Sequence, residues 1–423
     1  MTAAVGRYNG ESETQVKLAK WLQSKRRGDA MSLAVTAVML LLAMGMGLLS
    51  LGLQMRLYSG RTASEIVARC AADAGLTMAL FKMNEQLKTK PWSDSTLPEA
   101  TDQELSNCDA DYNYKVQSSI DGYLIESVGT SGPCQKRVYA TLQLQGLFEH
   151  AILTRETLAL KSGTLVDGYN SLDALDADSD VDIGTQSTSD ASIILNKGVT
   201  VEGDVIVGIG GNPDTVIKDL GATTGGQYSA TQNDPLPEIA PPALPNKAAA
   251  ITAQDKTITL TPADSGVYTS IELKNGSAPG LLEITGGEVT LRITGDISLG
   301  QSCEIIVRNG ASLIIYADGN IACGNNSNIN TENPPEAAST LQLYATGEGQ
   351  QSFDLKAKSE FTGVIYAPNA NVQLNAGGDA YGSIVANTFE FKSGGNYHYD
   401  EALRKVETDD QGARFVVKRW REG

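Results

Sequence analysis

The most constraining feature of the sequence is an uncharged apolar stretch of 25 residues, Met31 to Met55. A helix rises ~1.5 Å per residue, so this stretch is longer than the ~30 Å hydrocarbon core of a bilayer. A helix also satisfies its own backbone hydrogen bonds, which makes insertion feasible. The polar residues within the stretch are few: Ser32, Thr36, Ser50 and Gln54. We therefore predict a transmembrane helix over residues 29–55.

A cleaved secretory signal is the competing interpretation. Such a signal has an apolar core of ~7–15 residues followed by small residues at a cleavage site. The stretch here is longer, and the ten residues that follow it, RLYSGRTASE, contain no A-x-A pattern. Basic residues are denser before it (Lys17, Lys20, Lys25, Arg26, Arg27) than after it (Arg56, Arg61, Arg69). This asymmetry predicts a cytoplasmic leader over residues 1–28, with residues beyond 55 outside the cytoplasm.

Composition limits the partners of the part that follows the helix. The net charge is −17, and most of the acidic residues lie beyond the apolar stretch. Nucleic acid and anionic membrane surfaces attract basic patches, so this charge disfavours both as partners of the body. The 43 glycines and the stretches rich in Val, Ile and Thr are typical of β structure with many tight turns.

The helical pattern continues past the apolar stretch, because residues 56–88 contain no proline. We predict one apolar face along this segment, formed by Ile66, Val67, Cys70, Ala74, Met78 and Phe81. The segment is rich in alanine, which permits close packing. Lys90-Pro91 is expected to end the helix. A single long helix over residues 32–88 is therefore predicted, half of it inside the membrane.

Three strands follow, over residues 112–116, 122–128 and 137–144, the second after an Asp-Gly turn. Packed as an antiparallel sheet on the outer half of the helix, they would close a domain over residues 56–146. The fold class is therefore α+β, with a further β-rich part beyond residue 146.

Short apolar runs between Gly, Asn and Asp turns recur beyond Gly146, and one pattern repeats. Its variants are Ile315-Tyr316-Ala317, Leu343-Tyr344-Ala345, Ile365-Tyr366-Ala367 and Ile384-Val385-Ala386. The last two lie 19 residues apart, and Gly363 and Gly382 keep the same register. We predict a parallel β-helix, or solenoid, over residues 147–220 and 251–403, with a β-sandwich as the alternative. Residues 221–250 are proline-rich and interrupt it as an excursion over its surface or a hinge; residues 404–423 are predicted to cap the last coil.

The five cysteines bear on stability rather than metal binding. Cys108 and Cys134 flank two predicted strands and are expected to form a disulfide in an oxidising compartment. Cys303 and Cys323, 20 residues apart, are expected on adjacent coils, where they could pair. Cys70 lies on the predicted helix and has no predicted disulfide partner. Without a C-x-x-C pattern, and with His150 and His398 as the only histidines, a metal site of these residues is not expected.

Two parts of the sequence resemble known families. Arg26-Arg27-Gly28 before the apolar helix, and the later Ala71–Leu76 element, resemble the N-terminal region of PilX-type minor pilins and related type IV pilus assembly proteins. Residues 198–205, 363–370 and 398–403 resemble an uncharacterised β-helical domain found on such pilin-like proteins. The resemblance implies a pilin-like subunit whose N-terminal helix joins other pilin-like subunits.

The resemblance also implies processing by a prepilin peptidase, which cuts after a glycine just before the apolar helix. That glycine is Gly28, and Asp29 would become the new N-terminus. Pilins usually begin with an aromatic residue or Met and carry Glu at the fifth mature position, whereas this sequence has Asp29 and Leu33 there. A processed pilin and an unprocessed single-pass anchor both remain open.

Catalytic chemistry has little support in the sequence. There is no G-x-S-x-G elbow, no P-loop lysine and no H-E-x-x-H. Carbohydrate-active β-helices need clustered carboxylates, and Asp379, Asp400 and Glu401 are interpreted as turn and cap residues. His398 is assigned a capping or packing role, and His150 stands alone.

One acidic run has the spacing of a calcium loop: Asp173, Asp176, Asp178, Asp180 and Asp182. It fails the EF-hand pattern, because Val181 stands where Gly is needed and Ser187 where the bidentate Glu should be. A solvated acidic loop is the preferred interpretation. A calcium site of Asp176, Asp178, Asp180 and Asp182 is the alternative, and no other cofactor is expected.

Together these features predict a non-enzymatic, membrane-anchored, pilin-like subunit of a type IV pilus or pseudopilus. Its β-helical part would be displayed in the periplasm or at the surface of a bacterial cell, for adhesion or assembly, with a glycan or surface ligand as a further partner. Two alternatives remain: a membrane-tethered carbohydrate-active enzyme, and a structural scaffold of the cell envelope.

Overall fold

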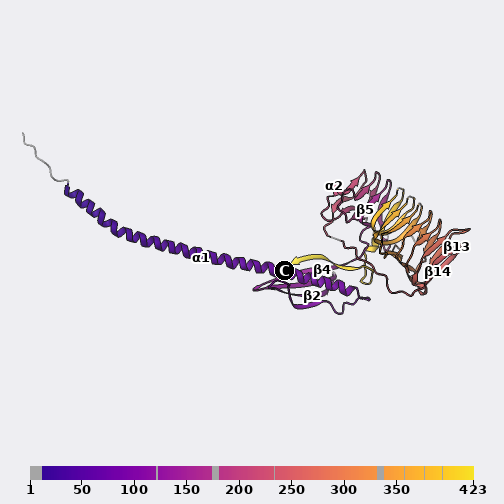
Figure 1. The fold of residues 1–423 in the computed structure, drawn as a ribbon, viewed down its shortest axis with the longest axis horizontal. Helices are drawn as coiled ribbons and strands as arrows, with labels where there is room; N and C mark the ends of the chain where they lie inside the picture. The colour runs from indigo at the N-terminus through magenta and orange to yellow at the C-terminus, as the bar shows by residue number, and fades with distance from the viewer. Residues whose placement is uncertain are drawn as a thin grey trace, which may run out of the picture. The chain divides into compact units, whose positions relative to one another are not determined.

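The computed structural model describes residues 12–423 apart from residues 121, 174–180, 233, 331–337, 357, 376 and 393 (Figure 1). The chain divides into two compact units. The first consists of Met1–Phe81, Leu97–Thr141 and Lys418–Gly423, and the second of Lys82–Thr96 and Leu142–Val417. Each unit is described below by itself.

A single helix, α1 (Ser12–Leu87), begins the described chain. It contains no proline, and it ends just before Lys90-Pro91, where the proline disfavours helical geometry in the residue before it. The predicted continuation of the apolar stretch into residues 56–88 is confirmed. The helix also begins earlier than residue 32, because the polar segment before the apolar stretch is helical too.

A small five-stranded sheet, most of which belongs to the first unit, has the order β1–β2–β3–β4–β29. Its strands are β1 (Glu99–Glu104), β2 (Asp111–Ser119), β3 (Gly122–Ser131), β4 (Cys134–Gln145) and β29 (Arg414–Glu422). The β1–β2 and β2–β3 pairs are antiparallel. The three predicted strands are confirmed as β2, β3 and β4. The C-terminal segment, assigned from the sequence to a cap on the last coil, instead supplies the edge strand β29.

The helix packs on this sheet through its smallest residues. Up to residue 79, the buried face of α1 is formed by Ala68, Ala71, Ala72, Gly75, Leu76 and Ala79; nearer the end of the helix, Met83 and Leu87 are also buried. The predicted apolar face was therefore largely wrong: Ile66, Cys70, Met78 and Phe81 are exposed. Small side chains are buried because they allow the helix backbone to approach the sheet closely, which a larger apolar residue would prevent.

The second unit contains a sheet of 24 strands, β5 to β28, here called the coiled sheet. Its first half consists of β5 (Ile152–Leu160), β6 (Leu165–Tyr169), β7 (Ile183–Thr185), β8 (Ile193–Leu195), β9 (Thr200–Val201), β10 (Asp204–Val207), a short helix α2 (Pro213–Val216), β11 (Ile217–Asp219) and β12 (Gly226–Ser229).

The second half of the coiled sheet comprises β13 to β28. Its elements are β13 (Ile251–Gln254), β14 (Thr257–Leu260), η1 (Pro262–Asp264), β15 (Gly266–Tyr268), β16 (Ile271–Lys274), β17 (Leu281–Ile284), β18 (Glu288–Ile293), β19 (Ile297–Leu299), β20 (Glu304–Val307), β21 (Ser312–Ala317), β22 (Ile321–Cys323), β23 (Asn328–Ile329), η2 (Ala338–Thr340), β24 (Leu341–Ala345), β25 (Gln351–Leu355), β26 (Glu360–Leu374), β27 (Ala380–Phe391), β28 (Asn396–Asp400) and η3 (Glu401–Arg404).

The chain winds through the coiled sheet in successive circuits. Through most of the second half, a strand pairs in parallel with the strand three places further on: β18 with β21, β19 with β22 and β20 with β23. The repeat found in the sequence is this stacking. Ile315 pairs with Leu343, Leu343 with Ile365 and Ile365 with Ile384, and Gly363 pairs with Gly382. The predicted register is therefore confirmed, and the large sheet is parallel.

The two halves of the coiled sheet join in an order that the sequence does not suggest. β27 and β28, at the end of the second half, pair in parallel with β5 and β6, at the start of the first. The column of stacked, inward-pointing residues continues across this junction, because Ile384 pairs with Ile152 and Ile152 pairs with Ile183. The first half therefore stacks on the last coil of the second.

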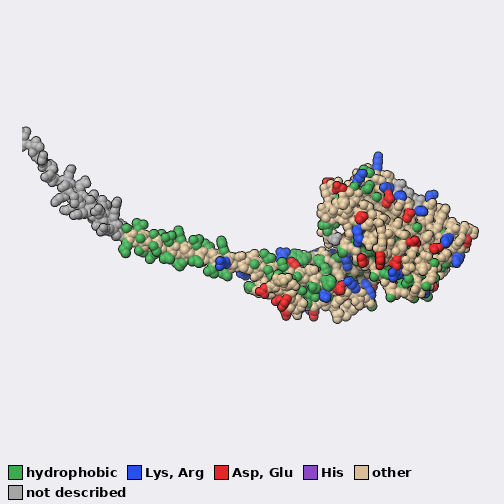
Figure 2. Space-filling view, viewed as in Figure 1, with side chains coloured by type: hydrophobic (Ala, Val, Ile, Leu, Met, Phe, Trp, Pro, Cys, Tyr) green, Lys and Arg blue, Asp and Glu red, His purple; other side chains and the backbone are tan. Residues whose placement is uncertain are grey.

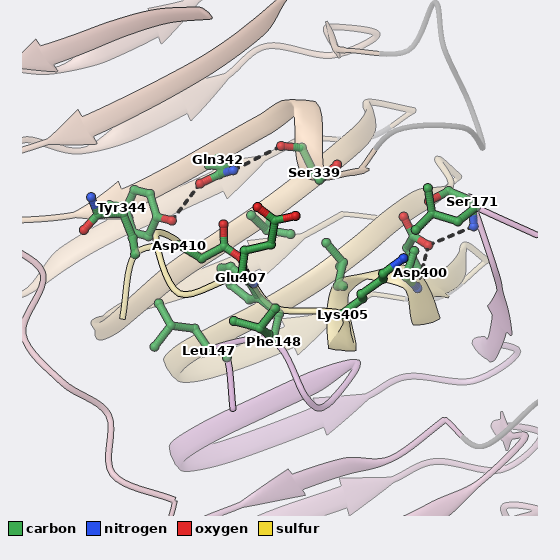
Figure 3. Close-up of a pocket in the computed structure, with 17 residues that line it drawn as sticks. Leu147, Phe148, Ser171, Ser339, Gln342, Tyr344, Asp400, Lys405, Glu407 and Asp410 are labelled. Atoms are coloured by element: carbon green, nitrogen blue, oxygen red, sulfur yellow. Dashed lines mark hydrogen bonds between the residues drawn. The ribbon is translucent and has the colours of Figure 1, made fainter. Parts of the chain in front are cut away.

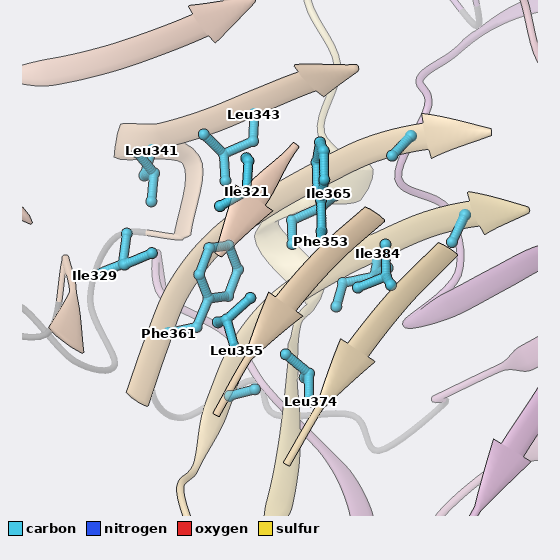
Figure 4. Packing of buried hydrophobic residues seen from close by; sticks show 14 of the residues in the cluster. Ile321, Ile329, Leu341, Leu343, Phe353, Leu355, Phe361, Ile365, Leu374 and Ile384 are labelled. Carbon is cyan, nitrogen blue, oxygen red and sulfur yellow. The ribbon is translucent and has the colours of Figure 1, made fainter. Parts of the chain in front are cut away.

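Stacked aliphatic and aromatic side chains fill the inside of the coiled sheet (Figure 4). Every second residue of a strand points inward, because successive side chains of a strand point to opposite faces of the sheet. In the part that Figure 4 shows, Ile321 pairs with Phe353 and Ile329 with Phe361, and all four side chains are buried. Each coil therefore buries its apolar face against its neighbours, which is how such a sheet is stabilised.

Candidate functional site

The apolar segment of α1 is the first candidate. The side chains from Met31 to Met55 are exposed, except that Gly45 is half-buried, so nothing in the described chain covers the segment (Figure 2). Leu42 is 60% exposed and Leu48 71%. The segment is long and apolar enough to cross a membrane. The hydroxyl of Thr36 is satisfied within the helix, since Thr36 Oγ1 donates to the carbonyl oxygens of Ser32 and Leu33, both at 3.0 Å.

Beyond this segment, α1 meets β3 at a contact that only glycine allows. A Cβ atom at Gly129 would lie 2.0 Å from the carbonyl oxygen of Ala68 and 2.4 Å from the backbone nitrogen of Ala72. On the helix, a Cβ atom at Gly75 would lie 2.3 Å from Ser127 Oγ. The apolar segment thus continues directly into a helix that is tightly held against a folded sheet.

A row of tyrosines lies on the outward side of the coiled sheet. Tyr316 and Tyr344 stack with ring centroids 5.3 Å apart, and Tyr366 follows at 6.3 Å. All three are buried, and burial raises their pKa values, that of Tyr316 to about 12. Because these residues point away from the coil interior, another segment must cover them.

That segment is residues 230–250, here called the strap, which links β12 to β13. Leu236 and Ile239 of the strap pack on the tyrosine cluster, and Tyr366 Oη donates to the carbonyl oxygen of Pro237 at 2.7 Å. Figure 1 places α2 and β13 at opposite ends of the coiled sheet, so the chain has to return along it here. Proline suits this path because it cannot donate to a strand ladder.

Asp234 anchors the start of the strap. Its carboxylate lies 3.2 Å from His150 Nε2, 3.3 Å from Arg414 Nη2 and 3.5 Å from Gln145 Nε2. The hydrogen bond from His150 is the main cause that lowers the pKa of Asp234, and burial opposes it. His150, which stood alone in the sequence, therefore fixes the strap. Arg414 also donates to the Pro235 carbonyl oxygen.

A cavity of about 330 Å³ lies next to this row (Figure 3). Its apolar walls include Phe148, Tyr344 and Val364, and its polar lining includes Asp400 and Lys405. Asp400 is fully buried, and its Oδ1 accepts from the backbone nitrogens of Ser171 (3.0 Å) and Ala402 (3.1 Å). Its Oδ2 has no hydrogen-bond partner among the described residues.

A second cavity, of about 450 Å³, lies where the strap leaves the sheet. Its floor includes outward positions of three successive coils: Leu153, Gly184 and Ile206. A Cβ atom at Gly184 would lie 2.8 Å from the Ile206 carbonyl oxygen, so the floor dips at the glycine. The lining mixes apolar side chains with the polar residues His150, Thr185, Gln186, Thr231, Gln232 and Asp234.

The carboxylates considered for catalysis hold turns. Asp400 is the N-cap of η3, as predicted. Asp379 Oδ1 accepts from the backbone and side-chain nitrogens of Asn396 at 3.3 and 3.1 Å, and Glu401 lies within η3. His398 packs on the ring of Tyr381, with centroids 4.5 Å apart, and its Nδ1 lies 2.5 Å from Asp167 Oδ1. The packing role predicted for His398 is confirmed.

Most of the predicted calcium loop cannot be compared with the structure. Asp176, Asp178 and Asp180 lie outside the described residues, and Asp182 is half-buried, with its backbone oxygen accepting from Ala151 at 2.9 Å. Among the described residues, no three His, Cys, Asp or Glu side chains are placed to hold a metal ion. Gly28 and Asp29 lie within α1, which does not test cleavage between them.

The predicted disulfides are corrected by the structure, because all five cysteines are free. Cys108 is exposed, whereas Cys134 is buried with its Sγ 3.8 Å from the Arg61 carbonyl oxygen. In the coiled sheet, Ile297 pairs with Ile321 and Glu304 with Asn328, so this circuit takes 24 residues rather than 20. Cys323 therefore stacks on Leu299 instead of lying beside Cys303, and burial raises its pKa to about 12.

Comparisons with known proteins give one family match and remote structural likenesses. Residues 229–406 match the model of a domain of unknown function, DUF7305. No curated protein matches the chain. The match covers the strap and the second half of the coiled sheet.

Three solved structures are similar at low identity. The competence-associated pilin ComZ from Thermus thermophilus is 16% identical, covering 85% of this chain and 97% of its own, with a TM-score of 0.32. An ice-binding protein from the Antarctic ascomycete Antarctomyces psychrotrophicus is 14% identical over 60% of this chain and 95% of its own (TM-score 0.26). A glycosylated ice-binding protein from an Arctic yeast is 15% identical over 59% and 90% (TM-score 0.29). TM-scores this low do not establish a shared fold.

Proposed function

We propose that the chain is a non-enzymatic, single-pass membrane protein of pilin-like design. Its α1 helix anchors it in a bacterial cytoplasmic membrane or joins the helix bundle of a type IV pilus or pseudopilus. The observation that carries this proposal is the uncovered apolar segment Met31–Met55, which continues without a break into a helix packed on a small sheet.

The energetics favour insertion of this segment. Each exposed Leu or Met side chain gains roughly 1.5–3 kcal/mol when it leaves water. A helix carries no unsatisfied backbone groups into the bilayer. Arg56 and Tyr58, both exposed, follow the segment directly, and Arg and Tyr side chains suit the membrane–water interface. The basic cluster before the segment supports a cytoplasmic N-terminus.

We propose that the coiled sheet is a parallel β-helix displayed outside the cytoplasm. The parallel, in-register pairing from coil to coil supports this, and so does the strap, which covers part of one side. A role in adhesion or assembly follows from this display. The resemblance of the N-terminal residues to PilX-type minor pilins supports a place among pilus-associated subunits.

The test of the proposal is membrane association of the full-length chain. Alkaline carbonate strips peripheral proteins, so the chain should stay in the pellet. Leu42→Arg places a charge near the centre of the apolar segment at a cost of about 2.5–3.5 kcal/mol, and should raise the fraction of protein extracted into the supernatant above that of the wild type. Leu220→Arg is the matched control, since Leu220 is exposed on the coiled sheet. Equal extraction of both variants would contradict the proposal.

Processing is tested on the same membrane fraction. Mass spectrometry of the N-terminal peptide should find Asp29 as the first residue if a prepilin peptidase acts after Gly28. An N-terminal peptide that runs through Arg27 would instead define an unprocessed anchor, with the membrane role unchanged.

A further inference from the structure

The two edges of the small sheet carry opposite charges. β1, at one edge, contains the acidic residues Glu99, Asp102 and Glu104 and no basic residue. β29, at the other edge, contains Lys418, Arg419 and Arg421 beyond Val417, with Glu422 as its single acidic residue. All of these side chains except Glu422 are clearly exposed, and Glu422 is about one-third exposed. In a chain with a net charge of −17, a basic edge strand is unusual.

Both edges are open in the described part of the chain. In the order β1–β2–β3–β4–β29, β1 has β2 as its neighbour and β29 has β4. The outward backbone groups of an edge strand are unpaired and can receive another chain. The sheet therefore presents one acidic and one basic docking edge.

Internal contacts use only part of this charge. Glu422 pairs with Arg69 at 3.7 Å and with Lys136 at 3.9 Å, and the Arg421 guanidinium lies 4.8 Å from the centroid of the Tyr139 ring. Within the described residues, no ion pair engages Lys418 or Arg419 of β29, or Asp102 or Glu104 of β1. These four side chains remain for an intermolecular contact.

Charged edge strands commonly serve to prevent edge-to-edge aggregation. Here the two edges differ in sign, which changes the outcome. An acidic edge repels a second acidic edge and a basic edge repels a second basic edge, but the unlike edges attract. A contact between unlike edges uses two different surfaces of each subunit, so it is heterologous and can repeat from subunit to subunit.

We propose that a second copy of this chain docks its β1 edge against the β29 edge, in a head-to-tail arrangement. The inference goes beyond the proposed function and does not rest on it, since both edges lie outside the apolar segment. β1 has an irregular register between Ala100 and Gln103, and Asp102 has a φ of +51°. This bulge limits continuous backbone pairing, so side-chain charge provides most of the contact.

The test uses the full-length chain in detergent micelles, followed by sedimentation velocity. At ~50 mM salt the wild-type chain should form multimers whose apparent affinity falls at least about tenfold at ~0.5 M salt, because surface charges are then screened. Lys418→Glu/Arg419→Glu makes both edges acidic, and Asp102→Lys/Glu104→Lys makes both basic. Each variant should sediment as single subunits, and an equimolar mixture should recover the multimers.

The matched control is Lys197→Glu/Lys218→Glu, which changes the net charge equally at exposed positions of the coiled sheet and should leave assembly unchanged. The mixture protects the test against misfolding, since misfolded variants would not recover assembly together. Three results would overturn the inference: a wild-type chain without multimers at low salt, double variants that assemble like the wild type, or a mixture that stays dissociated. None of these results bears on membrane anchoring.

Discussion

At the scale of single residues, α1 packs closely on β3 because Gly129 has no side chain. Gly129→Val would place its Cβ atom 2.0 Å from the Ala68 carbonyl oxygen, so the helix and strand must separate. Overpacking of this kind costs about 1–3 kcal/mol or more. We expect faster hydrogen exchange in β2 and β3, measured on the full-length chain. Gly349→Ala, whose Cβ atom meets nothing within 4 Å, is the control and should exchange like the wild type.

A second residue-scale prediction concerns Asp234 and pH. The hydrogen bond from His150 lowers its pKa in the folded state, so its stabilisation is complete above the unfolded value of about 3.9 and is lost as the pH falls below it. The protection factors of the strap amides, which compare the observed exchange rate with the intrinsic rate at the same pH, should therefore fall below about pH 4 in the wild-type chain. Asp234→Asn keeps the shape but not the charge, so its strap should exchange faster at neutral pH and respond less to acid. An acid response equal to that of the wild type would show that other carboxylates hold the strap.

Residues also show where sequence reasoning succeeds. The Ile-Tyr-Ala repeats predict which residues stack, because the strand period and the repeat spacing fix the register. They do not predict that Tyr316, Tyr344 and Tyr366 are buried on the outward side, since burial there comes from the strap. The predicted pairing of Cys303 with Cys323 is wrong for a related reason. Circuits of the coiled sheet differ in length, so a spacing in the sequence does not identify which residues are neighbours in space.

At the scale of elements, the strap is the part whose role the structure defines. Its proline content predicts an extended segment outside the strand ladders, and the described part of residues 231–244 forms no strand, whereas Asn246 pairs with Val267 of β15. Tyr366→Phe removes the hydrogen bond to the Pro237 carbonyl oxygen but keeps the ring, so it should destabilise the strap by about 1 kcal/mol. We expect cleavage within residues 234–245 by a low concentration of protease to become several-fold faster. Phe148→Leu, a change beside the same ring but away from the strap bond, should have a smaller effect.

The long helix is the element most fully predicted from sequence, because proline-free apolar and alanine-rich runs fix its extent. Its buried face was assigned to the larger apolar residues, whereas the structure buries the alanines. Apolar periodicity reports hydrophobicity and does not report how closely a sheet can approach. The exposed Ile66, Cys70 and Phe81 are thus surface residues in the described chain.

At the scale of the whole chain, the stacking of the first half of the coiled sheet on the end of the second half was not predictable. The pairing of Ile384 with Ile152 joins residues far apart in sequence, and any two coils with similar inward residues could stack. The same holds for the pairing of β29 with β4, because all the strands of the coiled sheet lie between these two strands in the sequence. Local patterns identify the strands, and the long-range order has to come from the structure.

The central claim is that α1 anchors the chain and leaves the rest outside the cytoplasm. The most direct test is labelling of the exposed thiol of Cys108 in intact spheroplasts with a membrane-impermeant maleimide, in a Cys70→Ser background that removes the other exposed thiol. We predict labelling of membrane-bound protein without detergent. Labelling that occurs only after the membrane is dissolved, or a protein found in the soluble fraction, would contradict the claim.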